Sequence, residues 1–351
     1  MNMRKNKYIN YFCSSSIVLC LFLHITSCVN DLLPDVQEAF DREANYTQQL
    51  YRPLLGRTTL FSNNFQPGNS TLPLTFEITR IIKADGSPAP ELTDIFPVKI
   101  WTKPYLGNEK SIEEIEAKRG IEYRPLFEVK KHSGEFVMWA NAMSSFVSCS
   151  PAKGYLFDVK VENKGGYKYF NNLQLIPYRE SDFEPAIYDQ ETGMLIDKDY
   201  ITPTVARSIW LESKRYSSAD QIHVYLRENH ENTDEPKSLT FRFYNSDYTP
   251  IPPQKFNLTK WDELIHGFNR EMGPDYVKYD VLYPIPLVQV PTKYTNTLGD
   301  MVRVRFEYDR ITSKGYRENS LLELEFAIYK EAHWEVVVVF AGGAPEFRDF
   351  E

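Results

Sequence analysis

Few side chains in this sequence have the type and spacing that nucleophilic catalysis requires. Ser150 and Lys153 satisfy an SxxK spacing, in which one helical turn would bring the lysine beside the serine hydroxyl. Pro151 and Gly154 instead predict a turn that leads into a strand, so we do not expect Ser150 to be a nucleophile. The GxSxG, HExxH, P-loop, GxGxxG and paired CxxC patterns are missing. The sequence therefore nominates no catalytic residue.

Metal ligands are equally scattered along the chain. The histidines beyond residue 27 have neither a histidine four residues away nor a thiolate nearby, as a zinc site would need; they are His132, His223, His230, His266 and His333. Asp197 and Asp199 resemble the start of a calcium loop, but the glycine and the distal glutamate of an EF-hand are missing. We predict no metal and no cofactor.

Carboxylates are abundant, with 48 acidic residues in the chain. Glycoside hydrolysis needs two carboxyl groups at a set distance in space, which the sequence cannot specify. A polysaccharide-directed hydrolase with a carboxylate pair outside the known motifs therefore stays open as an alternative.

Aromatic side chains suggest a binding role. Three of them should project from the more polar face of a strand, because they share its parity with charged residues: Trp101 with Lys99, Tyr225 with Arg227, and Tyr244 with Arg242. An exposed tryptophan or tyrosine offers a flat apolar surface on which a sugar ring stacks, and its polar atom keeps it wettable. The alternative is that a second layer or a helix covers these rings.

The N-terminus reads as a lipoprotein signal peptide over residues 1–27. A basic stretch precedes an apolar run that is too short to span a bilayer, and small residues then lead to Cys28. The segment Ile25-Thr26-Ser27-Cys28 resembles the bacterial lipobox, whose cysteine thiol receives a diacylglyceryl group. Two or three acyl chains on Cys28 would anchor the protein stably to a membrane, with the rest of the chain outside the cytoplasm.

Removal of residues 1–27 also removes Cys13 and Cys20, and lipid would occupy Cys28. Cys149 is then the one thiol left, so no intrachain disulfide forms, and we expect Cys149 to be a small buried apolar residue. The mature chain keeps 37 basic and 48 acidic residues, because three basic residues leave with the signal peptide. This acidic balance disfavours nucleic acid as a partner.

The rest of the chain predicts a mainly β fold with two β-sandwich-like domains and a few short helices. We place a lipid-anchored tether and a short helix in residues 28–56, an N-terminal domain in 57–190 and a C-terminal β-rich domain in 191–351. The helix should follow Pro34 and end before Gly56. The turn-rich stretch 183–203 supplies the boundary between the domains.

Three strand patterns are specific enough to predict pairings. Residues 155–161 and 167–170 alternate on either side of a glycine turn and predict a hairpin. Residues 302–308 and 321–328 should pair antiparallel, with Arg305 opposite Glu323 and apolar residues matched on the other face. Residues 334–340 are apolar on both faces, which is typical of a central strand.

Two further helices are predicted. Ser111 and Glu114 form a capping box that should start a helix, with Ile112 and Ile115 facing the core. The segment 259–268 has apolar residues spaced by three and four, so a second helix should pack on a sheet there.

Three segments resemble a family of uncharacterised lipoproteins of the Bacteroidetes; they are Arg57-Thr58-Thr59-Leu60-Phe61-Ser62-Asn63-Asn64-Phe65, Asp94-Ile95-Phe96-Pro97-Val98-Lys99-Ile100-Trp101 and His132-Ser133-Gly134-Glu135-Phe136. The resemblance implies an association with starch-utilisation-type (SusC/SusD) porin and lipoprotein pairs and with fasciclin-domain lipoproteins. It supplies no catalytic residue.

These observations lead to one principal hypothesis and two alternatives. The principal one is a lipid-anchored, non-catalytic outer-membrane lipoprotein, facing the cell surface, that binds glycan or a neighbouring uptake protein as an accessory to nutrient capture. The alternatives are the hydrolase described above and a structural or adhesive surface protein.

Overall fold

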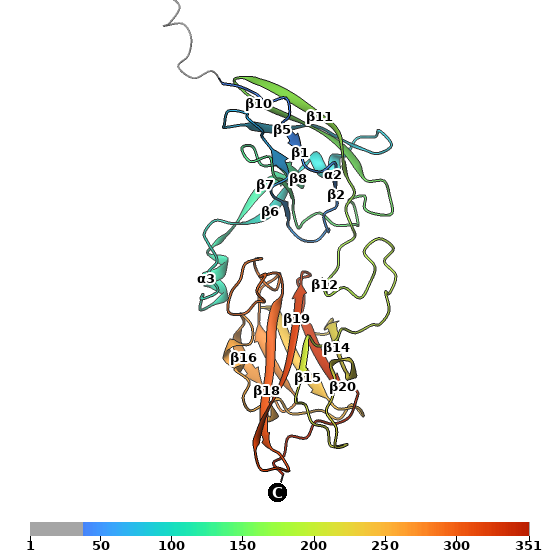
Figure 1. The fold of residues 1–351 in the computed structure, drawn as a ribbon, viewed down its shortest axis with the longest axis vertical. Coiled ribbons are helices and arrows are strands. Elements are labelled where there is room, and N and C mark those ends of the chain that lie inside the picture. Colours follow the sequence, from blue (N-terminus) through green and yellow to red (C-terminus); the bar gives the residue numbers. More distant parts are fainter. Residues whose placement is uncertain (1–37, 351) are drawn as a thin grey trace, which may run out of the picture.

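The computed structural model describes residues 38–350, and Figure 1 shows two β-rich halves that follow one another along its long axis. The mainly β fold predicted from the sequence is confirmed. Buried side chains form two hydrophobic clusters, one drawn from Tyr46 to Leu175 and the other from Phe183 to Phe340. The residue limits proposed for the two domains stay predictions.

The largest sheet of the N-terminal half has the order β2-β11-β10-β5. Strands β10 (Tyr155–Asn163) and β11 (Gly166–Leu175) form the predicted hairpin. Strand β5 (Thr75–Lys83) pairs with the other side of β10, and β2 (Leu50–Tyr51) runs parallel to β11. Alternate residues of β10 are buried, which agrees with the period of two in its sequence.

Short elements close the core of this half: β1 (Asn45–Tyr46), β3 (Thr59–Phe61), β4 (Phe65–Gln66), α2 (Pro90–Thr93), β8 (Phe127–Val129) and β9 (Phe136–Met138). The core is aromatic, because the ring of Phe136 packs edge-on against Tyr51 and Phe157, with centroids 4.8 and 5.1 Å away.

A two-stranded ribbon extends from the N-terminal half. It consists of β6 (Ile95–Trp101) and β7 (Arg119–Pro125), and the segment between them carries α3 (Ile112–Glu116). The predicted N-cap of α3 is confirmed, since the Ser111 hydroxyl accepts a hydrogen bond from the Glu114 N–H at 3.3 Å. Figure 1 shows this extension reaching alongside the top of the C-terminal half.

The C-terminal half is a sandwich of two sheets. In the first, β18 (Val302–Ile311) pairs with β19 (Arg317–Ile328) in the predicted register, with Arg305 opposite Glu323. The short strands β12 (Phe183–Glu184) and β13 (Val205–Arg207) also pair with β19.

The second sheet has the order β14-β20-β15-β17-β16. Its strands are β14 (Ile222–Glu228), β20 (Trp334–Phe340), β15 (Ser238–Tyr244), β17 (Tyr276–Asp280) and β16 (Phe268–Met272). The prediction that residues 334–340 form a central strand is confirmed, because β20 lies between β14 and β15. The two sheets pack through aromatic rings, with Phe306 of β18 against Phe241 and Phe243 of β15.

Two helix predictions were wrong within the described residues. The structure has no helix in residues 38–56, where β1 and β2 form instead and bury Tyr46 and Tyr51 in the core. The segment 259–268 contains one 3-10 turn, η3 (Trp261–Glu263), after which Phe268 begins β16. A single turn already buries Trp261, and the backbone from Phe268 onwards pairs with β17 as an edge strand instead of continuing as a helix.

The other 3-10 helices are η1 (Ala219–Gln221) and η2 (Pro253–Lys255). Between residues 38 and 350, no helix has the length and apolar content needed to cross a bilayer.

Candidate functional site

The outer face of the second sheet carries a hollow of about 450 Å³. The side chains of Val336 and Val338 point into the sandwich core, so the alternate residues of β20 point outwards. On this outer face Tyr225 of β14 lies opposite Val337, and Tyr244 of β15 pairs with Val339. The structure therefore brings two of the three predicted stacking residues to one place.

The floor of the hollow is apolar. Val337 and Val339 belong to its lining and are only 7% and 3% exposed. The phenol rings around this floor, rather than the valines themselves, would cover the apolar face of a ring-shaped ligand and leave the edge of that ligand to polar groups.

A third tyrosine, which the sequence reasoning missed, completes the rim. Tyr248 is 62% exposed and lies in the turn that follows β15. Side chains hold this turn in place: the Asn245 side-chain oxygen accepts hydrogen bonds from the N–H groups of Asp247 and Thr249. Because loop aromatics carry no strand parity, no periodic signal marked Tyr248.

Charged groups occupy one end of the hollow. The Arg242 guanidinium donates to Glu335 at 3.1 Å and to Asp275 at 2.9 Å, and it lies 5.3 Å from the ring centroid of Tyr276. Arg227 lies 4.9 Å from the ring centroid of Tyr225. The hollow thus combines aromatic faces, hydrogen-bond donors and one carboxylate.

The Tyr225 hydroxyl is neutral at physiological pH. Burial, with a smaller contribution from the Asp199 carboxylate, raises the pKa of Tyr225 above its usual value. Tyr200, which does not line the hollow, packs edge-on against Tyr225 and stacks on His223 with centroids 3.8 Å apart. Burial lowers the pKa of His223, so that ring is neutral as well. The Tyr225 phenol can therefore both donate and accept a hydrogen bond.

A larger hollow of about 720 Å³ lies between β5 and β8. The aromatic rings in its lining, Phe76 and Phe127, are 4% and 1% exposed, so neither offers a face to a ligand. We therefore take the outer face of the second sheet as the candidate site.

Trp101, the third predicted stacking residue, lies at the joint between the two halves. Its ring is half-buried. The Arg119 guanidinium carbon lies 4.7 Å from the centroid of the Trp101 ring, and the centroids of the Trp101 and Tyr105 rings are 5.5 Å apart. Arg119 also donates to the backbone carbonyl of Tyr283, which belongs to the C-terminal half. Neighbouring groups thus cover Trp101, and it does not line the hollow.

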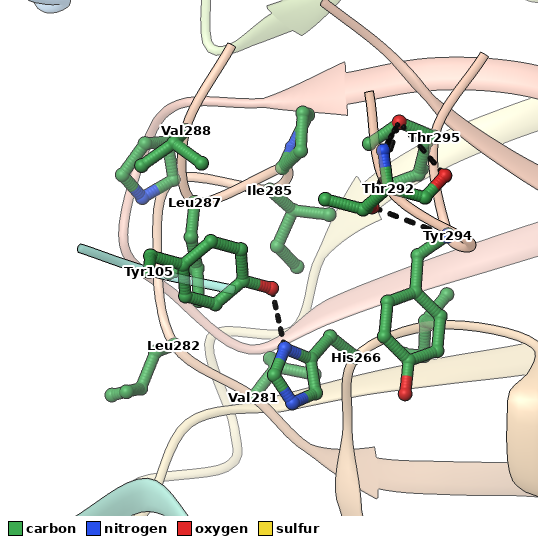
Figure 2. A pocket seen from close by; sticks show the side chains of 14 residues that line it. Tyr105, His266, Val281, Leu282, Ile285, Leu287, Val288, Thr292, Tyr294 and Thr295 are labelled. Atoms are coloured by element: carbon green, nitrogen blue, oxygen red, sulfur yellow. Dashed lines mark hydrogen bonds between the residues drawn. The ribbon is translucent and has the colours of Figure 1, made fainter. Parts of the chain in front are cut away.

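The joint is built around His266, on the segment before β16 (Figure 2). The Tyr105 hydroxyl hydrogen-bonds Nδ1 of His266, and Nε2 of His266 contacts the backbone carbonyl of Glu109 at 2.9 Å. Tyr294 stacks on the imidazole with centroids 4.9 Å apart. Burial lowers the pKa of His266, so the ring is neutral, with Nε2 as the donor.

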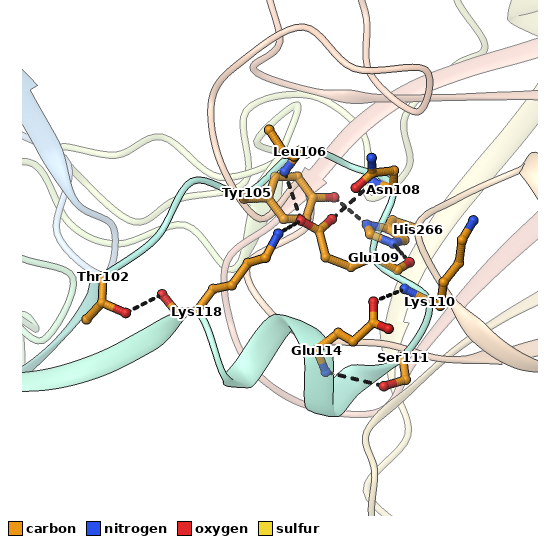
Figure 3. A network of polar contacts seen from close by, with 10 residues as sticks. All are labelled: Thr102, Tyr105, Leu106, Asn108, Glu109, Lys110, Ser111, Glu114, Lys118 and His266. Carbon is orange, nitrogen blue, oxygen red and sulfur yellow. Dashed lines mark hydrogen bonds and ion pairs between the residues drawn. The ribbon is translucent and has the colours of Figure 1, made fainter.

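Glu109 organises the segment that reaches the joint (Figure 3). Its carboxylate accepts the N–H groups of Leu106 at 2.9 Å and Asn108 at 3.0 Å, together with the Lys118 ammonium. Burial alone would raise the pKa of Glu109, but these donors outweigh it and hold the pKa at about 2. The ionised carboxylate thereby fixes the loop that presents Tyr105.

The joint does not have room for an organic ligand. The cavity beside Tyr105 and His266 measures about 20 Å³, which is the space of one water molecule. We assign the joint a structural role. Sequence reasoning missed it, because its partners lie 161 residues apart and a lone histidine gives no signal.

The remaining positions considered from the sequence are the candidate metal ligands, Cys149 and Cys28. Residues 38–350 contain no cluster of three potential metal ligands. Cys149 is partly buried, and burial raises the pKa of its thiol, as expected for an inert cysteine. Cys28 and the signal peptide lie outside the described residues.

Comparison with known proteins gives the chain a family but no function. No curated protein and no solved structure matches it. Residues 65–349 match the family described as "Domain of unknown function (DUF5007)", and the chain therefore belongs to that family.

Proposed function

We propose that this protein is a non-catalytic glycan-binding lipoprotein that holds a saccharide in the hollow on the outer face of its second sheet. The observation that carries the proposal is the arrangement of Tyr225, Tyr244 and Tyr248 around the apolar floor of Val337 and Val339. The phenol rings match the apolar face of a sugar ring.

The polar groups at the end of the hollow suit the hydroxyl edge of the same sugar. Glu335 can accept hydrogen bonds from sugar hydroxyls, and Arg227 can donate to them. Arg242 is braced by Glu335 and Asp275, so its guanidinium is held in place before a ligand arrives.

The lining of the hollow favours binding over hydrolysis. Glycoside hydrolysis uses two carboxyl groups that flank the scissile bond. Glu335 is the one carboxylate among the residues that line the hollow, and it already accepts a hydrogen bond from Arg242. The hydrolase alternative therefore has less support than a binding role.

The cellular setting of this proposal rests on the sequence. The lipobox resemblance at Cys28 supports a lipid anchor in the outer membrane, facing the cell surface. The resemblance to lipoproteins that accompany starch-utilisation-type pairs supports a role beside neighbouring uptake proteins. In this setting the hollow would capture glycan for import by those partners.

The test is saccharide binding by the purified protein, measured by calorimetry over a panel of polysaccharides. Tyr225→Ala and Tyr248→Ala should each weaken binding of the best ligand at least about tenfold, because each removes one stacking surface. Tyr316→Ala, a matched change at a tyrosine that is 50% exposed outside the hollow, should leave the affinity unchanged. Trp101→Ala should also leave the affinity unchanged, because Trp101 does not line the hollow.

Two results would refute the proposal. One is an affinity that both rim substitutions leave unchanged. The other is the failure of every polysaccharide to bind; if a protein partner co-purified in that case, the structural or adhesive alternative would replace glycan binding.

A further inference from the structure

Arg227 has an unusual position among the charged groups of the hollow. It lies on β14 directly opposite Glu335 of β20, the position at which a cross-strand ion pair would form. The Glu335 carboxylate is instead bound by Arg242, which approaches from β15 on the other side of β20. The Arg227 guanidinium lies over the ring of Tyr225.

The two arginines that line the hollow therefore differ in their ion pairs. Arg242 has two carboxylate partners, Glu335 and Asp275. Arg227 has no ion pair within residues 38–350, although Asp199 acts on the adjacent Tyr225. The result is one exposed, unmatched cation at the rim of an aromatic hollow, on a chain with a net charge of −8.

The chemistry of the guanidinium restricts what it recognises. Its planar fork of N–H donors matches an anionic group with two oxygens, and its charge stays fixed at physiological pH. The cation–π contact with Tyr225 holds the group at the rim without using its N–H donors in a hydrogen bond to a side-chain acceptor. A neutral sugar would leave this charge without a partner.

We infer that the saccharide bound in this hollow is acidic and that its anionic group, a uronate carboxylate or a sulfate ester, pairs with Arg227 while its ring lies on the Tyr225 side of the floor. The inference rests on the proposed function and narrows its ligand class.

The experiment is calorimetry of the full protein against matched probes. The carboxylate arm compares polygalacturonate and alginate with their carboxyl-reduced, neutral forms, and the sulfate arm compares dextran sulfate with dextran. At least one acidic polymer should bind about tenfold or more tightly than its neutral counterpart, because the charge-assisted bond is lost with the anion. The arm in which this occurs identifies the anionic group.

Substitutions connect that preference to Arg227. Arg227→Gln should remove most of the advantage of the acidic polymer, and Arg227→Lys should restore part of it by returning the charge without the fork. Arg207→Gln, at an exposed arginine on β13 of the other sheet, is the matched control and should change nothing.

The outcomes separate the two proposals. If neutral and acidic polymers bind equally, or if Arg227→Gln keeps the full preference while Tyr248→Ala abolishes binding, the acidic-ligand inference is overturned and glycan binding stands. If no polymer of either kind binds, both are overturned.

Discussion

The hydroxyl of Tyr105, on the segment that joins β6 to α3, is hydrogen-bonded to Nδ1 of His266 in the C-terminal half. This contact and the bond from Arg119 to the Tyr283 carbonyl link the two halves across the joint. The hydrogen bonds of the joint are partly buried and join specific partners, so the strength of the joint depends on each partner and on pH.

Tyr105→Phe should destabilise the protein by about 0.5–1.5 kcal/mol, because the imidazole acceptor of His266 would lose its donor in a partly buried site. The phenylalanine ring keeps the packing against Trp101, so lost contact area does not explain the effect. Chemical denaturation measures the change. Tyr316→Phe is the control, and a Tyr105→Phe variant as stable as this control would show that the bond contributes nothing.

Stability should fall as the pH is lowered through about 6.5, the ordinary pKa of histidine. Burial lowers the pKa of His266 in the folded state, so the unfolded chain binds the proton more tightly and acid favours unfolding. The charges near the ring act in both directions, with Glu109 opposing the shift and Lys110 and Lys293 adding to it.

The measurement is denaturation of wild type and His266→Gln between pH 5 and 8. The variant should lose less stability over this range, by up to about 1.4 kcal/mol for each pH unit between 6.5 and the lowered pKa of His266 in the folded protein. His223, whose pKa is also lowered, contributes equally to both proteins, and His230→Gln serves as an exposed control. Equal pH slopes in wild type and His266→Gln would contradict the assignment.

Cys28→Ala should abolish labelling of the protein by radioactive fatty acid in the producing cell, because the substitution removes the thiol that accepts the diacylglyceryl group. Cys149→Ala is the matched control and should keep the label. Label that persists on Cys28→Ala would exclude lipidation at that residue.

The sequence by itself determined the features that depend on neighbours along the chain. Alternation predicted the mainly β fold, the hairpin of β10 and β11, and the register that sets Arg305 opposite Glu323, because side chains on one face of a strand repeat every two residues. The cap of α3 was equally local, since Ser111 and Glu114 lie within one turn.

Only the tertiary structure decided which faces meet. Parity placed Tyr225 and Tyr244 on polar faces, but their shared hollow exists because β20 lies between β14 and β15, and that pairing joins residues about a hundred positions apart. Trp101 had the same parity signal, yet Arg119 covers it at the joint. A pattern along one strand carries no information about the layer that packs on it, so burial had to be settled by contacts distant in the chain.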